Sequence, residues 1–366
     1  MDSELLYQLA LTLIPNIGDV QARQLIQHFG KASDVFKAAK SSIEKIEGIG
    51  SLKAKNIKDF KDFTTAEKEI EFIEKYKIKT LFLTDEQYPK RLLNCYDAPP
   101  LLFYKGLADL NASKTLAIVG TRTNTDAGKQ FTENLIKELS YHNVTIISGL
   151  AYGIDAVAHK SALKNNLPTV GVVGHGLDKI YPADHAALAR EMLKENGGLL
   201  SEFFSGTKPD KHNFPLRNRI VAGISDATLV VETHVKGGSM ITAKLADAYN
   251  RDVFAVPGRP SDVKSSGCNY LIQHNKAILL TEAKGLLEVL GWTDKKTKPK
   301  QQKELFVEFT DNEKAVMNLL QKKEPLHIDE LNLSSNLSSS SIAAALLSLE
   351  LQNVILSVPG KMYKLS

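Results

Sequence analysis

The stretch TLAIVGTRTNTDAGKQFTENLIKELSYHNVTIISGLAYGIDAVAH, residues 115–159, determines the fold that we predict for this chain. It contains two apolar runs, 116–119 and 144–147, and a short polar loop with glycine follows each of them. Each loop should open a helix, so the stretch predicts two strand–loop–helix units in a row. Backbone N–H groups at the positive end of a helix suit phosphate. Two such loops at one edge of a parallel sheet would form a single anion-binding crevice.

The alternation of strand and helix continues to about residue 291. Further strands are expected at 169–173, 199–200, 227–231 and 253–256, with helices between them. Continuous apolar strands rich in β-branched residues are typical of a parallel sheet that helices cover on both faces. Residues 113–292 should therefore form an α/β domain with three layers.

Residues 1–65 have the apolar spacing of short helices. Two phrases, at 15–18 and 46–50, place an apolar-x-Gly turn between helices, and this resembles the helix-hairpin-helix family. There the glycine turn lets backbone N–H groups approach a DNA phosphate. A helical bundle with glycine caps and no ligand is the other interpretation, and both stay open. Residues 66–112 should be a connector leading into the sheet, with a helix at 66–76, a strand at 80–83 and an extended segment at 88–93.

The C-terminal part begins with TDKKTKPKQQKE, residues 293–304, a polar, lysine-rich run that predicts a linker. Residues 305–366 should form three helices and a hairpin whose strands lie at 354–356 and 362–365. This arrangement resembles a winged helix. The unit holds five lysines and no arginine against seven acids, so both protein contact and DNA binding stay open.

The composition bounds the class of protein. The chain has 366 residues, a net charge of +4 and 43% hydrophobic residues, which predicts two or three globular domains compatible with nucleic acid. Its two cysteines, Cys95 and Cys268, lie far apart, so we expect no disulfide and a reducing cytoplasm. The nine histidines show no ligand spacing, so no metal site is expected. We see no signal peptide and no membrane span.

Common cofactor signatures are absent from the sequence. Residues 120–128 are GTRTNTDAG instead of G-x-G-x-x-G, and no acid follows the second strand, which argues against nicotinamide or flavin. No P-loop occurs. Asp155 and His159 lie four residues apart and could form an acid/base pair, but we find no nucleophile placed beside them, and a structural role is favoured. We therefore predict neither a cofactor nor catalysis.

Two other helix starts carry groups suited to a nucleic-acid strand. In HNFPLRNRIVAG, residues 212–223, two arginines straddle Asn218 close to Phe214. Guanidinium groups bind phosphates bidentately, and an aromatic ring can stack an unpaired base. The run 237–239 with Lys244 is a third helix start suited to phosphate. The crevice is therefore interpreted as a phosphate track, a surface that binds successive phosphates of a nucleic-acid strand. Gly120 and Gly149 would be small so that the protein backbone can approach that strand closely.

Together these phrases resemble the DNA-processing protein A family (DprA, also called Smf). The residues that carry the resemblance lie at 119–122, 148–159, 174–182, 201–202, 214–220, 238–243 and 256–269. The resemblance implies an extended Rossmann-like domain between an N-terminal helical domain, of helix-hairpin-helix or SAM-like type, and a C-terminal winged helix. It further implies a homodimer without catalytic activity. This dimer binds and protects incoming single-stranded DNA and promotes RecA loading in natural transformation.

The predicted nucleic-acid-binding residues lie in the glycine loops and at the helix starts. They are Gly120, Arg122, Ser148, Gly149, Tyr152, Gly153, Phe214, Arg217, Asn218, Arg219, Gly238, Ser239 and Lys244. The resemblance places the three arginines and Lys244 in a basic pocket. Two residues depart from it: Tyr152 stands where many members carry lysine, and Gly237 stands where serine is common.

Two other classes of function share features with this sequence. The sheet with paired glycine loops also resembles nucleotide phosphoribohydrolases of the lysine-decarboxylase-like group. Their P-G-G-x-G-T-x-E phrase corresponds here to HVKGGS, residues 234–239, which lacks the proline and the acid. This absence favours a binding protein over a hydrolase. A structural adaptor for other recombination proteins is the third class.

Overall fold

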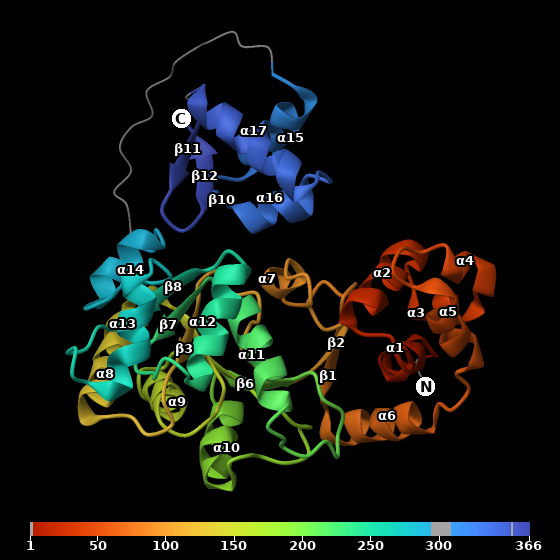
Figure 1. Ribbon diagram of the computed structural model, residues 1–366, viewed down its shortest axis with the longest axis horizontal. Helices are drawn as coiled ribbons and strands as arrows, with labels where there is room; N and C mark the ends of the chain where they lie inside the picture. Colours follow the sequence, from red (N-terminus) through yellow and green to blue (C-terminus); the bar gives the residue numbers. More distant parts are fainter. Residues whose placement is uncertain (1–2, 294–308, 353) are drawn as a thin grey trace. The chain divides into compact units, whose positions relative to one another are not determined.

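A computed structural model describes residues 3–293, 309–352 and 354–366. Contacts divide the chain into two compact units, Met1–Leu279 and Leu280–Ser366, each of which is described by itself (Figure 1). The predicted linker lies, apart from Thr293, outside the described residues. The predicted domain boundaries stay predictions.

The first unit is built on a sheet of nine strands in the order β1-β2-β6-β5-β4-β3-β7-β8-β9. The strands are β1 (Lys79–Phe82), β2 (Leu101–Gly106), β3 (Thr115–Val119), β4 (Thr145–Ser148), β5 (Thr169–Val172), β6 (Gly197–Ser201), β7 (Ala227–Val230), β8 (Asp252–Ala255) and β9 (Ile278–Leu279). The run from β6 to β9 is parallel throughout, as predicted. Strand order reverses between β3 and β7, which is where α/β sheets bind ligands.

The segment predicted as a connector contributes two antiparallel strands to this sheet: β1, which confirms the strand predicted at 80–83, and β2, which was not predicted. β2 pairs with β6, and β1 pairs with β2 (Figure 1). Leu102 and Phe103 of β2 are buried, so this strand is part of the core. The expected extended segment at 88–93 is partly wrong, because Lys90–Leu93 forms the short helix α7 directly after Pro89. Proline suits this position because the first turn of a helix needs no N–H donor.

Helices lie on both faces of the sheet, as the three-layer prediction requires. They are α8 (Asp126–Leu139), α9 (Ile154–Lys164), α10 (Ala186–Lys194), α11 (Asn213–Gly223), α12 (Gly238–Ala248) and α13 (Ser266–Gln273). Helix α9 packs beside α8 and α10, whereas α11 packs beside α12. Right-handed crossovers place these two groups on opposite faces, because the strand order reverses between them.

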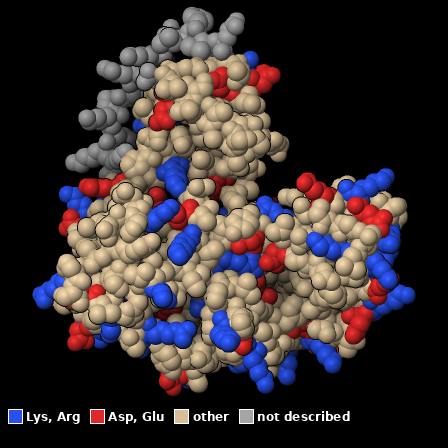
Figure 2. All heavy atoms as spheres, in the orientation of Figure 1, with Lys and Arg blue, Asp and Glu red and all other residues tan. Residues whose placement is uncertain are grey.

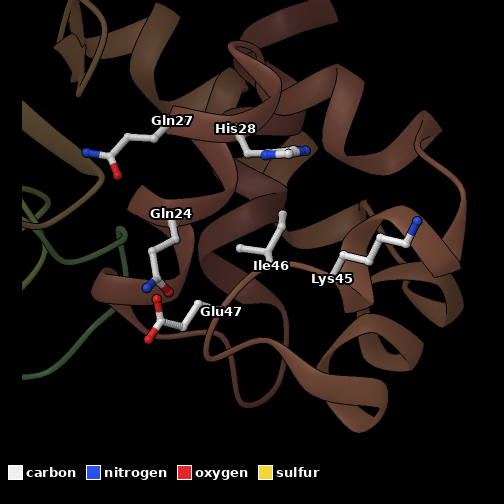
Figure 3. Close-up of a pocket in the computed structure, with 6 residues that line it drawn as sticks. All are labelled: Gln24, Gln27, His28, Lys45, Ile46 and Glu47. Atoms are coloured by element: carbon white, nitrogen blue, oxygen red, sulfur yellow. The ribbon is translucent and has the colours of Figure 1, made fainter.

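The N-terminal part is a bundle of α1 (Ser3–Leu13), α2 (Asp19–Phe29), α3 (Ala32–Lys37), α4 (Lys40–Glu44), α5 (Gly50–Asp59) and α6 (Thr64–Tyr76). Turns with positive φ join α1 to α2, at Asn16, and α4 to α5, at Gly48 and Gly50. The two predicted helical hairpins are therefore present. Beside the second turn lies an open pocket of about 420 Å³ whose lining includes Gln24 and Ile46 (Figure 3). DNA contact at this hairpin stays a prediction.

The second unit contains α14 (Ala283–Val289), α15 (Asp311–Lys322), α16 (Ile328–Ser334) and α17 (Ser339–Leu351). Its small antiparallel sheet has the order β10-β12-β11, from β10 (Leu326–His327), β11 (Ile355–Val358) and β12 (Met362–Leu365). Thr310 caps α15 in a capping box with Glu313. Helices α15, α16 and α17 with the hairpin of β11 and β12 confirm the winged-helix prediction for residues 305–366, to which the structure adds β10.

Among the helices that the structure describes, none has the length and apolar character that crossing a lipid bilayer requires.

Candidate nucleic-acid interface

The loop between β3 and α8 begins the candidate site, at the carboxyl edge of the sheet. Thr125 caps α8 and accepts a hydrogen bond from Gly128 N at 3.0 Å. The buried carboxylate of Glu232, which follows β7, accepts hydrogen bonds from the backbone N–H (2.9 Å) and the hydroxyl of Thr125. A Cβ on Gly128 would lie 2.6 Å from this carboxylate. The expectation that this helix start is open to phosphate is therefore wrong, because a carboxylate of the chain itself lies there.

The loop between β4 and α9 packs directly against the first loop. Gly153 has a φ of +77°, and a Cβ on it would lie 2.1 Å from the carbonyl oxygen of Thr121. Ile154 N donates to that same oxygen at 3.2 Å. A Cβ on Gly120 would lie 2.5 Å from the Ile154 side chain. The predicted shared edge is thus confirmed, and both glycines are small because the two loops touch each other.

Polar groups of the second loop have partners inside the chain. Gly149 N and Ala151 N donate to Asp155 Oδ2 at 3.1 and 3.3 Å. Ser148 is fully buried and donates to the carbonyl oxygen of Ile118 at 2.6 Å. The structure therefore places Ser148 and Gly149 beneath the surface instead of on it.

Asp155 and His159 are both buried, as expected for residues with a structural role. Nδ1 of His159 lies 2.7 Å from the Thr169 hydroxyl, and burial lowers the pKa of the histidine to about 3. Burial raises the pKa of Asp155, while the Arg217 guanidinium opposes this shift. Neither side chain is positioned to exchange protons with a ligand, because His159 is fully buried and Asp155 nearly so.

Arg217 is buried, with 5% of its surface exposed. Its Nη1 donates to the carbonyl oxygen of Val172 at 2.5 Å, at the end of β5. The guanidinium group also fills the space over Gly149, where a Cβ would lie 1.9 Å from Nη1. Burial lowers the pKa of Arg217 to about 10, although the Asp155 carboxylate acts in the opposite direction. Arg217 therefore joins the ends of β4 and β5 from inside.

Arg219 is equally buried and contacts carboxylates instead of solvent. It forms ion pairs with Glu202 and, at 3.0 Å, with Asp19 of α2, and it donates to the carbonyl oxygen of Asp97. Burial raises the pKa of Glu202 to about 7, against the attraction of Arg219. The sequence suggested two phosphate-binding arginines here, whereas the structure surrounds both with groups of the chain.

Arg122 is the arginine of the predicted set that is exposed. Its guanidinium carbon lies 5.6 Å from the centroid of the Phe214 ring, within cation–π range. The Tyr181 ring stacks on Phe214 with centroids 5.9 Å apart and planes 27° apart. A Cβ on Gly174 would lie 3.1 Å from Phe214, so the phenylalanine is packed and half-buried. Arg122 and the rings of Phe214 and Tyr181 thus form one cluster beyond the carboxyl ends of β3 and β5.

The remaining predicted residues divide between surface and interior. Gly238 and Lys244 of α12 are exposed, Asn218 is half-buried and Ser239 is buried. Helix α12 starts at Gly238, and its N-cap residue Gly237 offers no side-chain hydrogen bond. Figure 2 shows Lys and Arg side chains over the part of the molecule that α11 and α12 occupy.

Tyr181 was missed as a site residue, although it belongs to the cluster. It lies in the loop after β5, as Arg122 lies in the loop after β3, and 44% of its surface is exposed. A tyrosine in a loop that follows a parallel strand, near two other such loops, was the available signal.

Comparisons with known proteins agree with this arrangement. Residues 79–291 match the family model of DNA recombination-mediator protein A, and residues 296–361 match the DprA winged helix domain. Protein Smf of Synechocystis is 33% identical, with 99% of each chain covered. DNA processing protein DprA of Streptococcus pneumoniae is 41% identical over 58% of this chain and 74% of its own.

Two solved structures resemble the fold. The X-ray structure of DprA from Streptococcus pneumoniae has a TM-score of 0.67 and 33% identity, covering 78% of this chain and 98% of its own. DNA processing protein A from Helicobacter pylori, studied for its single-stranded DNA binding mode, has a TM-score of 0.52 and 32% identity, covering 58% and 94%. With the family model spanning the whole sheet and Protein Smf matching end to end, the chain belongs to the DNA recombination-mediator protein A family.

Proposed function

We propose that this chain binds single-stranded DNA at the carboxyl edge of its sheet. The observation that carries the proposal is the exposed Arg122 beside the stacked rings of Phe214 and Tyr181. A cation can bind the phosphates of a single strand, and neighbouring aromatic rings can stack on its bases. Together they bind a single strand without recognising its sequence. The single-stranded DNA binding mode of the Helicobacter pylori relative supports it.

In this proposal the contacts come from the exposed members of the predicted set. Arg122 binds phosphate, and Lys244 and the uncapped start of α12 extend the track. Gly120 and Gly153 bring the two loops together, and Gly149 leaves room for the Arg217 guanidinium group. The buried side chains of Ser148, Arg217 and Arg219 stabilise the edge from inside.

The cellular role follows from the family. We propose that the chain acts in the cytoplasm as a recombination mediator that protects incoming DNA and promotes loading of the RecA recombinase in natural transformation. The match to the recombination-mediator family supports this role. We propose no turnover, since His159 and Asp155 are buried and have partners inside the chain.

We further propose that the chain forms a homodimer through the edge strand β9. Ile278 and Leu279 are 41% and 50% exposed there, although they are apolar. An open, apolar edge strand favours pairing with a second chain. Ile278→Lys should shift the mass measured by analytical ultracentrifugation from dimer to monomer, and an unchanged mass would place the interface elsewhere.

The experiment for DNA binding compares single-stranded and duplex oligonucleotides in fluorescence anisotropy. Arg122→Glu should weaken binding of single strands of any sequence. Lys137→Glu is the matched control, because it makes the same change of charge at the opposite edge of the sheet. Lys137 is exposed in the last turn of α8, the end farther from the candidate site. Equal losses in both variants, or no loss in either, would contradict the proposed site.

A further inference from the structure

Two exposed tyrosines lie at the carboxyl edge, on neighbouring loops. Tyr152 follows β4 and Tyr181 follows β5, with 42% and 44% of their surfaces exposed. Phe214, between Gly174 and the Tyr181 ring, is half-buried. The accessible ring surface at this edge therefore belongs to the tyrosines more than to the phenylalanine.

The Tyr152 ring is held in one orientation. Its hydroxyl donates to Asp184 Oδ2 at 2.8 Å, and its ring packs edge-to-face with that of His185, with centroids 5.0 Å apart. His185 is buried and bonded through Nδ1 to the carbonyl oxygen of Leu150 at 2.8 Å. A ring that is already ordered loses little conformational entropy when a ligand stacks on it.

The two phenols are neighbours at this edge, and the phenol of Tyr152 has a hydrogen-bonded carboxylate beside it. The pKa of Tyr152 is raised, first by its hydrogen bond to Asp184 and further by the nearby Tyr181 phenol. Tyr181 is fixed in turn, because its backbone N–H donates to Nε2 of His175 at 3.3 Å and its ring stacks on Phe214. Two oriented rings, with the Asp184 carboxylate next to Tyr152, are suited to bases and unsuited to phosphate, which a carboxylate repels.

We propose that Tyr152 and Tyr181 form a platform on which unpaired bases of the bound strand stack, while Arg122 holds the phosphates. This inference rests on the proposed binding of single-stranded DNA. It assigns base stacking to the two tyrosines and phosphate binding to Arg122. The competing explanation is that Tyr152 serves only to fix the loop that carries Asp184.

The test uses the full chain with two labelled strands of equal length, oligothymidylate and an abasic strand that has the phosphates without the bases. Tyr152→Ala and Tyr181→Ala should each weaken oligothymidylate binding between about five-fold and about a hundred-fold, the range for one stacked base. Their affinity for the abasic strand and the salt dependence of binding should not change. Tyr152→Phe, which keeps the ring, should recover most of the loss.

Tyr141→Ala is the matched control, since Tyr141 is 81% exposed and lies at the start of β4, at the opposite edge. Equal losses on both strands, or unchanged oligothymidylate binding by both alanine variants, would overturn the platform while leaving the proposed function standing. A failure of the unaltered chain to bind either strand would overturn the proposed function itself, and the platform with it.

Discussion

Arg219 extends from α11 into the interior, where Glu202 and Asp19 surround its guanidinium group. In the sequence it stands two residues from Arg217 and looks equally suited to phosphate. Its partners come from segments far away in the chain, so the sequence offers no signal of its burial. The same holds for Arg217, whose main partner is a backbone carbonyl group at the end of β5. The sequence therefore identified arginines that can bind phosphate, but it did not show that Arg217 and Arg219 are buried.

Glu202 should make the stability of the first unit depend on pH. Its pKa is about 7 in the folded chain and should be near 4.5 when unfolded. Between these values the folded chain keeps a proton that the unfolded chain has released, so the free energy of unfolding should fall as pH rises through this window. Glu202→Gln removes this dependence.

The measurement is urea unfolding of the unaltered chain and Glu202→Gln from pH 4.5 to 8. The difference between the two free energies should change by up to about 3 kcal/mol across the window. The low pKa of His159 acts with the opposite sign below pH 6.5, and it cancels in this difference because both proteins contain it. A difference that stays constant with pH would contradict the prediction.

At the scale of elements, the contact between the two glycine loops shapes the candidate site. Strands β3 and β4 were predictable because each is a short apolar run followed by glycine. The antiparallel pairing of β2 with β6 was not, because it joins residues almost a hundred positions apart and leaves no local periodicity. The carboxylate at the start of α8 was missed for the same reason, since Glu232 follows β7.

Gly153→Ala should separate the two loops. The substitution meets both a positive φ of +77° and the carbonyl oxygen of Thr121 at 2.1 Å. The strained backbone alone costs about 1–2 kcal/mol, and the collision adds to it. Gly206→Ala is the matched control, because Gly206 has a φ of +81° but nothing within 4 Å. Denaturant unfolding should show a larger loss for Gly153→Ala, and equal losses would contradict the loop contact.

At the scale of the whole molecule, the sheet and the winged-helix region differ in their charged residues. The first unit exposes Arg122 at the carboxyl edge of its sheet and Lys244 on α12, whereas the winged-helix region of residues 305–366 has seven acids against five lysines. Its fold was predictable from helix spacing and the Pro359-Gly360 turn, and its composition argues against a main role in DNA binding.

Reversing the charge of lysines in the second unit should therefore leave DNA binding unchanged. The double variant Lys322→Glu and Lys364→Glu alters two exposed side chains of α15 and β12. Anisotropy with a single-stranded oligonucleotide should give the affinity of the unaltered chain. A loss as large as that of Arg122→Glu would show that the winged helix contributes to the track.

The most direct test of the account is the salt dependence of single-strand binding by the unaltered chain and by Arg122→Ala. The logarithm of affinity should fall linearly with the logarithm of salt concentration, and the slope should be the same for strands of different sequence. Arg122→Ala should reduce the magnitude of this slope by about 0.7, the value for one phosphate contact on a single strand. An unchanged slope in Arg122→Ala would contradict the claim that Arg122 binds phosphate at the carboxyl edge of the sheet.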